Sequence, residues 1–347
     1  NDPTNVRGFD LSITANGNIG AVTDVMTGAV DALRTQVNVI HLDTGAQGDQ
    51  VAISNSGTLT IGTPLRIPAD GKVYLQANGN LDAHRVSAPA TGDLALLASG
   101  VLQLPTDALT TTGNLRLEGQ TDVLSSGATP RSIAANAGSL RFVTGSQGGD
   151  TQLNSQTGNL YVSSGAHDLV IENQGQLSMV DVIGTGNIDF TNDSGFVANN
   201  FITSGTDKTL RLTAEDGDIT ILGAMAGNSS LSVELAANNG DVTLAQHAGG
   251  LKSLSIEATN ISLVGATTNG GAQSYKGATR LGGTYMTNGG SFTIEGATQL
   301  TDSTAIVTGN GNVRLQTVDG EQELIIANGT GTVRFSDAVG ASEALAS

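Results

Sequence analysis

The stretches Gly92-Asp93-Leu94-Ala95-Leu96 and Gly113-Asn114-Leu115-Arg116-Leu117 decide the fold, because they repeat one five-residue phrase twenty-one residues apart. The phrase consists of a glycine, a small polar residue, an apolar residue, any residue and a second apolar residue. Further copies begin at Gly57, Gly71, Gly138, Gly158, Gly175, Gly186, Gly217, Gly240, Gly290, Gly311 and Gly331. A sequence period of about twenty to twenty-five residues is typical of a solenoid.

The spacing of the two apolar residues predicts the backbone of each copy. Residues two apart place their side chains on the same face only in an extended strand. The glycine before the strand is expected to turn the chain sharply by adopting positive φ. One short strand cannot bury its inner face, but stacking on equivalent strands about 4.8 Å above and below completes a core. The sequence therefore predicts an all-β fold, a parallel β-helix.

Composition and charge narrow the class of protein. The phrase continues along the chain without a linker or a charge run, which predicts one elongated domain over residues 1–347 and a fragment of a longer repetitive protein. Cysteine is absent, so disulfides and thiolate metal sites are excluded. The net charge of −17 and pI near 4.3 disfavour nucleic acid as a partner. No apolar stretch has the length of a membrane span.

The residue between the two apolar positions of each phrase is expected to face solvent. Several of the few arginines of this acidic chain occupy that position, together with a tyrosine. One interpretation is ordinary solvation with alternating charge. The other is an exposed contact stripe for an acidic glycan or a neighbouring fibre, formed by Arg116, Arg141, Tyr161, Arg211, Arg314 and Arg334.

Aromatic residues are assigned by their place in the phrase. Phe142, Phe190 and Phe335 occupy the second inward position, which predicts core packing. Tyr275 and Tyr285 lie in a less regular stretch of the sequence, where exposure to solvent is expected. The stretches 136–165 and 265–290 are rich in Gly, Ser, Asn, Gln and Thr, and are expected to bulge from the coil as longer turns.

The segment from Val22 to Leu33 is ambiguous. Its apolar residues recur at three- and four-residue spacings, which is the pattern of an amphipathic helix. Gly28, Thr27 and Thr35 favour strands, as does the alternation of apolar residues that follows. We predict strands, and expect a helix, if one forms, to cap or decorate the first turns.

The sequence contains few residues in patterns typical of metal binding. The histidines His41, His84, His167 and His247 are isolated and match no metal-binding spacing. Calcium-binding β-rolls repeat a nine-residue glycine and aspartate signal, of which Gly148-Gly149-Asp150 and Glu215-Asp216-Gly217-Asp218 are only fragments. We therefore predict no cofactor, with calcium as a weak alternative.

Catalysis has one route in this sequence. Polysaccharide hydrolysis needs two carboxyl groups about 5–10 Å apart. Stacked turns can bring Asp216, Asp218 and Asp241 together, but these residues are typical of turns and have no Lys, Arg or His beside them. We predict that the chain is not an enzyme.

Two groups of motifs resemble the repeats of filamentous-haemagglutinin-like bacterial surface proteins. Near the C-terminus they are Gly270-Gly271-Ala272-Gln273-Ser274-Tyr275-Lys276-Gly277-Ala278-Thr279-Arg280-Leu281-Gly282, Val318-Asp319-Gly320 and 331–340. Near the N-terminus they are Gly17-Asn18-Ile19-Gly20 and Asn55-Ser56-Gly57-Thr58-Leu59-Thr60-Ile61. The resemblance implies a right-handed β-helix shaft in a large secreted adhesin outside a Gram-negative-type bacterium. The secretion domain of that family is not recognisable here.

Three functions are consistent with the sequence. The first is a non-catalytic structural or adhesive shaft of a secreted surface protein or fibre. Its partners would be other copies or neighbouring segments of the same protein, and cell-surface or matrix glycans. The second is a subunit of an end-to-end stacked extracellular filament, because neither terminus has an evident polar cap. The third, of another class, is a polysaccharide-processing β-helix enzyme.

Overall fold

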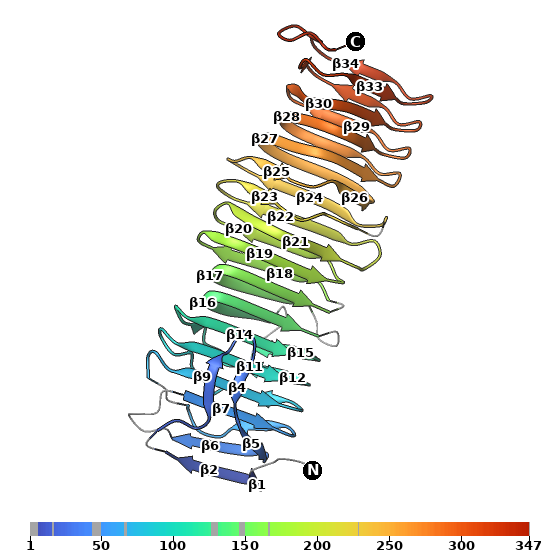
Figure 1. Ribbon diagram of the computed structural model, residues 1–347. Coiled ribbons are helices and arrows are strands. Elements are labelled where there is room, and N and C mark those ends of the chain that lie inside the picture. Colours follow the sequence, from blue (N-terminus) through green and yellow to red (C-terminus); the bar gives the residue numbers. More distant parts are fainter. Residues whose placement is uncertain are drawn as a thin grey trace. The chain divides into compact units, whose positions relative to one another are not determined.

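The computed structural model describes residues 6–15, 17–43, 50–65, 68–125, 131–145, 150–165, 167–227 and 229–346. Within these residues the chain is an all-β parallel β-solenoid with about 21 residues per turn and no helix, as the phrase predicts. Two compact units, Asn1–Glu172 and Asn173–Ser347, are described in turn. Figure 1 labels the strands of both.

The described residues of unit 1 form two parallel sheets and one antiparallel hairpin. The larger sheet of unit 1 comprises β1 (Val6–Arg7), β5 (Leu33–Gln36), β7 (Gln50–Asn55), β9 (Lys72–Ala77), β11 (Asp93–Ala98), β13 (Leu109–Thr110), β14 (Asn114–Gly119), β16 (Arg131–Thr144) and β17 (Thr151–Ser164). The smaller sheet comprises β2 (Asp10–Thr14), β6 (Val39–Asp43), β8 (Leu59–Ile61), β10 (Leu81–Asp82), β12 (Val101–Leu104) and β15 (Asp122–Ser125). The hairpin is formed by β3 (Ala21–Asp24) and β4 (Ala29–Asp31).

Unit 2 continues the same pattern of short parallel strands, after β18 (Leu169–Gln174) at the boundary. They are β19 (Leu177–Gly184), β20 (Ile188–Asn192), β21 (Phe196–Thr203), β22 (Thr209–Ala214), β23 (Ile219–Ile221), β24 (Ser232–Ala237), β25 (Val242–Leu244), β26 (Ala248–Leu251), β27 (Ser253–Thr268), β28 (Gln273–Met286), β29 (Phe292–Glu295), β30 (Thr298–Val307), β31 (Val313–Leu315), β32 (Val318–Asp319), β33 (Leu324–Ala327) and β34 (Val333–Phe335).

The register of the strands aligns equivalent positions of the phrase. Leu94 lies opposite Val73 on one side and Leu115 on the other, and Leu96 lies between Leu75 and Leu117. These side chains are fully buried and form the interior of unit 1. In unit 2, Leu210, Val233 and Leu254 align in the same way. The apolar pair of the phrase thus points inward in both units, as predicted.

The phrase glycines are required for a different reason from the predicted one. Only a minority of them, such as Gly175 and Gly217, have positive φ. A Cβ atom added to Gly113 would lie 2.1 Å from the carbonyl oxygen of Gly92 in the adjacent turn, and one added to Gly311 would lie 1.8 Å from that of Gly290. At these two glycines the turns stack so closely that no side chain fits, whereas a Cβ added to the phrase glycine Gly57 meets no atom within 4 Å.

Polar side chains satisfy the backbone at the turns of unit 2. A threonine or asparagine side chain just before a turn donates to the carbonyl of the glycine three residues later. The pairs are Thr268 with Gly271, Thr287 with Gly290, Thr308 with Gly311, and Asn328 with Gly331. Such bonds replace water at buried carbonyl groups, which is expected where successive turns cover one another.

Three expectations about the interior are wrong. Tyr275 and Tyr285 are fully buried in unit 2, where they pack edge-to-face on Phe292. The stretches expected to bulge as loops are largely strands, β16 and β17 in unit 1 and β27 and β28 in unit 2. Phe335 is 39% exposed, because β34 pairs with β31 and no other described strand. Phe142 and Phe190 are buried as predicted.

Candidate binding site beside the β3–β4 hairpin

The β3–β4 hairpin lies across the outer face of the larger sheet of unit 1 (Figure 1). The segment from Val22 to Leu33, which the sequence left ambiguous, therefore forms strands, as predicted. Its tip is tightened by Asp24, which accepts hydrogen bonds from the Met26 amide (2.8 Å) and the Thr27 hydroxyl (2.9 Å). These bonds stabilise the carboxylate and lower the pKa of Asp24. Gly28 has φ of +79°, a conformation that favours glycine in a hairpin turn.

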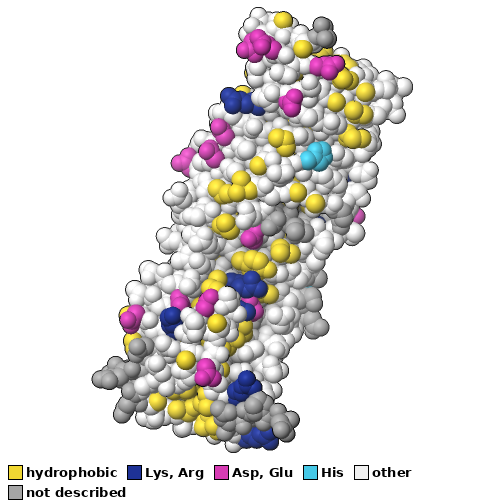
Figure 2. All heavy atoms as spheres, viewed as in Figure 1, with side chains coloured by type: hydrophobic (Ala, Val, Ile, Leu, Met, Phe, Trp, Pro, Cys, Tyr) yellow, Lys and Arg dark blue, Asp and Glu magenta, His cyan; other side chains and the backbone are white. Residues whose placement is uncertain are grey.

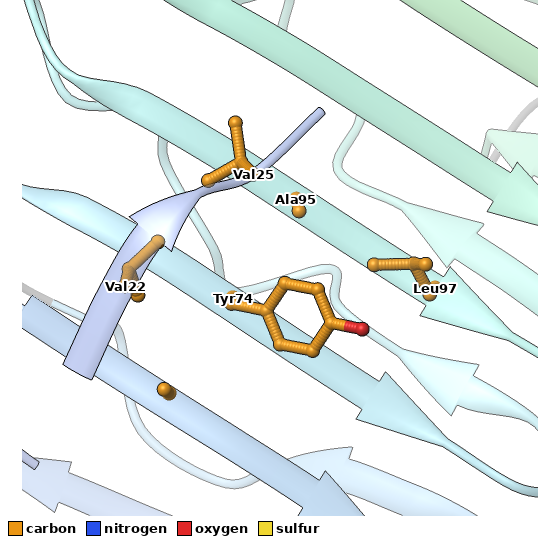
Figure 3. Packing of buried hydrophobic residues seen from close by; sticks show 6 residues of the cluster. Val22, Val25, Tyr74, Ala95 and Leu97 are labelled. Atoms are coloured by element: carbon orange, nitrogen blue, oxygen red, sulfur yellow. The ribbon is translucent and has the colours of Figure 1, made fainter. Parts of the chain in front are cut away.

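An apolar cluster holds the hairpin to the sheet. Val22 and Val25 point down from the hairpin onto Tyr74, Ala95 and Leu97, as Figure 3 shows. Ala52, Tyr74 and Ala95 are aligned on neighbouring strands, so a large side chain alternates with small ones. The small residues beside the tyrosine ring leave room for the two valines of the hairpin segment. Tyr74 occupies a position expected to face solvent, yet it is only 5% exposed.

Polar contacts fix the outer edge of β3 and the hairpin tip. The Arg116 Nη1 atom donates to the carbonyls of Val25 (3.2 Å) and Met26 (2.9 Å). The Gln50 Oε1 atom accepts from the Val22 amide at 2.8 Å. These side chains satisfy backbone groups that a two-stranded hairpin would otherwise present to water. The hairpin is therefore anchored by side chains from the first and the last strands that it crosses.

Glu118 organises the arginines beneath the tip. Its two carboxylate oxygens accept from Arg116, Nε at 2.9 Å and Nη2 at 3.2 Å, and Oε1 also accepts from Arg141 Nε at 2.6 Å. Burial acts to raise the pKa of Glu118, but the bonds from the two guanidinium groups outweigh it and lower that pKa. Arg141 in turn lies over the Tyr161 ring, 4.1 Å from its centroid.

Two hollows flank the hairpin tip. The first, about 310 Å³, is lined by Asp31 of the hairpin and by Arg34, Ser54, Gln76 and Asn78 of the sheet. The second, about 260 Å³, is lined by residues that include Thr27, Ser99, Arg116, Glu118 and Gln120. Gly28, Tyr74 and Gln76 border both hollows. Hydroxyl, amide and charged groups dominate the lining, which suits a polar ligand.

The predicted contact stripe divides between the two units. In unit 1, Arg116, Arg141 and Tyr161 are aligned on adjacent strands, but only 14% of the Arg116 side chain is exposed because the hairpin covers it. Exposure was expected from the phrase, and for Arg116 this expectation is wrong. In unit 2, Arg211, Arg314 and Arg334 are exposed, and the latter two are aligned.

Arg211 has partners of its own. It lies between Asp189 and Glu234 on the neighbouring strands, with contacts of 3.3 Å and 2.9 Å. The hydrogen bond that Arg211 donates to the Glu234 carboxylate is the main cause of the raised pKa of Arg211. Charges of opposite sign thus alternate along this column, which is the pattern expected of a solvated sheet face. The face shown in Figure 2 likewise carries its charged side chains singly or in small groups.

The carboxylates considered for catalysis bond to the backbone of neighbouring turns. Asp218 accepts from the Asp241 amide, and Asp241 accepts from the amide of Asn260. Each carboxylate thus caps the strand of the next turn. Gly148 and Gly149 of one calcium-like fragment lie outside the described residues. Among the residues that are described, no group of three or more His, Asp or Glu side chains could hold a metal ion.

The histidines make local contacts. His41 lies 3.4 Å from Asp10, and His84 contacts both Asp82 and Arg85. His247 contacts the Thr267 hydroxyl at 3.0 Å. In the part of the chain described here, no helix is long and apolar enough to cross a bilayer.

Comparisons of the chain with known protein families, with curated proteins and with solved structures find no match.

The two hollows beside the hairpin, which together form a groove, were not predicted from the sequence. Two signals in the sequence point to it. One is the Asp24-to-Gly28 turn between two alternating segments, which is a hairpin pattern. The other is Arg116-x-Glu118, which places opposite charges on one face of a strand.

Proposed function

We propose that the chain is a structural, non-catalytic segment of a secreted bacterial surface protein or extracellular fibre. The observation that supports this is the use made of the repeated residues. In each unit the apolar pair of the phrase fills the interior, and turn side chains such as Asp93 and Asp218 accept from the amide of the next turn. Residues that serve stacking in this way stiffen a repeat protein, because each turn is stabilised by its neighbours.

Location outside the cell and an adhesive role rest on the resemblance to filamentous-haemagglutinin-like repeats. The partners proposed with it are neighbouring segments or other copies of the same protein, and surface glycans. The absence of cysteine fits a protein that crosses membranes unfolded and needs no disulfide on arrival.

Immunogold electron microscopy tests the location. Antibodies raised against the purified chain are applied to intact cells of the source bacterium and to permeabilised cells. Gold on intact cells, lost after external protease treatment, is the expected result. Labelling that requires permeabilisation refutes an extracellular shaft.

Two assays on the purified protein separate this proposal from its alternatives. Negative-stain images are expected to show separate particles at all concentrations, whereas long fibres that grow with concentration favour the stacked filament. Incubation with acidic and neutral polysaccharides is expected to release neither unsaturated sugars nor new reducing ends. Release of sugars that increases with protein concentration and with time favours the polysaccharide-processing enzyme.

A further inference from the structure

The groove formed by the two hollows contains polar groups that the protein itself leaves unbonded. Gln76 shows this most clearly, because its Oε1 atom accepts from the Tyr74 hydroxyl (3.2 Å) and the Ser54 hydroxyl (3.4 Å). Its amide NH₂ group retains both donors. Among the described residues, the side chains of Arg34, Asn78 and Gln120 make no hydrogen bond or ion pair with protein.

These groups differ from their counterparts elsewhere on the outer faces. The Arg211 guanidinium is shared between two carboxylates, and Lys276 is paired with Glu257. In the groove, Asp31 and Arg34 line the same hollow without forming an ion pair. A negatively charged acceptor on the hairpin and a positively charged donor on the sheet therefore remain available in the same hollow. Such groups are bonded to water until a ligand replaces it.

The floor of the groove repeats in register. Asn78, Ser99 and Gln120 each follow an aligned strand end, and their amides bond to Asn55, Ala77 and Ala98 of the preceding turn. Neighbouring strands lie about 4.8 Å apart, so a polar side chain recurs at that interval. Because the strands and the Arg116–Glu118 contacts hold the walls, a ligand would order few groups on binding.

The chemistry of the lining selects the ligand class. Asp31 only accepts, Arg34 only donates, and the amides of Gln76 and Asn78 do both. A hydroxyl group also does both, so a ligand with several adjacent hydroxyls can satisfy all of these side chains at once. The small apolar share of the lining disfavours a hydrophobic ligand, whose pockets are mostly apolar. The net charge of −17 disfavours polyanions.

We propose that the groove beside the β3–β4 hairpin binds a neutral saccharide, with Asp31, Arg34, Gln76 and Asn78 as its polar contacts. The proposal rests on the extracellular function only in that a shaft outside the cell meets glycans. An extended peptide fits less well, because peptides are bound by adding a strand to a free sheet edge. The floor of this groove is a sheet face, not an edge.

The test uses the purified full chain and an array of neutral gluco-, galacto-, manno- and xylo-oligosaccharides, followed by calorimetric titration of the best binder. The groove variant is Arg34→Ala combined with Asn78→Ala. Arg211→Ala is the matched control, since it removes an exposed outer-face arginine from unit 2. Circular dichroism and thermal unfolding confirm that each variant is folded.

The expected result is saturable binding that the groove variant weakens at least about tenfold, the effect of losing a charged hydrogen bond, and that the control leaves unchanged. A second groove variant, Gln76→Ala, should weaken binding while leaving the Arg34 side chain in place. Equal losses in groove and control variants overturn the site. Absence of saccharide binding by the folded chain, or preferred binding of sulfated glycans or of peptides, overturns the ligand class. Each of these results is independent of where immunogold places the chain on the cell.

Discussion

The outer faces of the two units carry the same pattern of residues and end in different environments. In unit 1, Arg116 is covered by the hairpin and is 14% exposed. In unit 2, Arg211 occupies the equivalent position of the phrase and is 50% exposed, between two exposed carboxylates. The phrase decides which face a residue occupies. An insertion elsewhere in the chain decides whether that face is open to water.

The insertion lies in an early turn of unit 1. The paired residues Val6 and Thr35 are twenty-nine positions apart, whereas Leu94 and Leu115 are twenty-one apart. The longer turn contains the hairpin, which folds back over strands that follow it in the sequence. The outer face thus carries a groove in unit 1 and a solvated column of charged side chains in unit 2.

The interior should be equally intolerant of charge in both units, and the neighbouring residues Leu212 and Arg211 test this most severely. Leu212 is fully buried, so Leu212→Asp places an unpaired charge in the core of unit 2. We expect it to lower the free energy of unfolding by at least about 4 kcal/mol and to expose this turn to protease. Arg211→Ala, on the outer face, should lower it by about 1 kcal/mol or less. Protease resistance near Leu212 that survives the aspartate would contradict the assigned faces.

The outer faces should differ when a carboxylate is removed. Glu118→Ala leaves Arg116 and Arg141 without their acceptor beneath the hairpin, which should lower the free energy of unfolding of unit 1 by about 3 kcal/mol. Glu234→Ala removes an exposed partner of Arg211 and should lower it by about 1 kcal/mol or less in unit 2. Urea unfolding of both variants measures the contrast. Equal losses would mean that the hairpin adds nothing to the ion pairs beneath it.

Much of this architecture could be predicted from the sequence, and the exceptions share a physical cause. The phrase identifies Leu94, Leu96 and their equivalents as inward-facing because a period of two is a local property of the backbone. The burial of Tyr74 and Arg116 depends on contacts with Val25 and Met26, which are about fifty to ninety positions distant. No periodicity within a strand reports such a contact. The groove therefore required the structure.

The aromatic interior of unit 2 shows a second limit. Tyr275 lies in a glycine-rich stretch that resembles a loop by composition. In the structure, Gly277 is a corner between two parts of β28, where an added Cβ would lie 2.0 Å from the Ala258 carbonyl oxygen. Glycine at that position permits close stacking of turns, and the neighbouring strand residues pack as elsewhere. Composition alone does not distinguish a tightly stacked corner from an open loop.

Close stacking at the phrase glycines should be common to both units, in contrast to the outer faces. Gly113→Ala in unit 1 and Gly311→Ala in unit 2 each press a methyl group against a carbonyl of the adjacent turn. We expect each to lower the free energy of unfolding by about 1–3 kcal/mol. A Cβ added to Gly57 meets no atom within 4 Å, so Gly57→Ala is the control and should change stability by about 0.5 kcal/mol at most. Thermal unfolding of the three variants would reveal whether a phrase glycine is needed for space or only for flexibility.

The smallest effect concerns pH and again separates the two faces. The pKa of Glu118 is lowered in the folded chain, so the unfolded chain binds more protons between that lowered value and the ordinary value of 4.5. The stability that Glu118 contributes is therefore fully present above about pH 4.5 and is lost as the pH falls toward the lowered pKa. Urea midpoints of the unchanged protein and of Glu118→Gln should differ at pH 6 and converge as the pH falls below about 4.5. Because other carboxylates titrate in both proteins, the difference between the two isolates Glu118. A difference that stays constant down to pH 3 would contradict this prediction. It would show that the guanidinium groups of Arg116 and Arg141 do not stabilise the ionised carboxylate of Glu118.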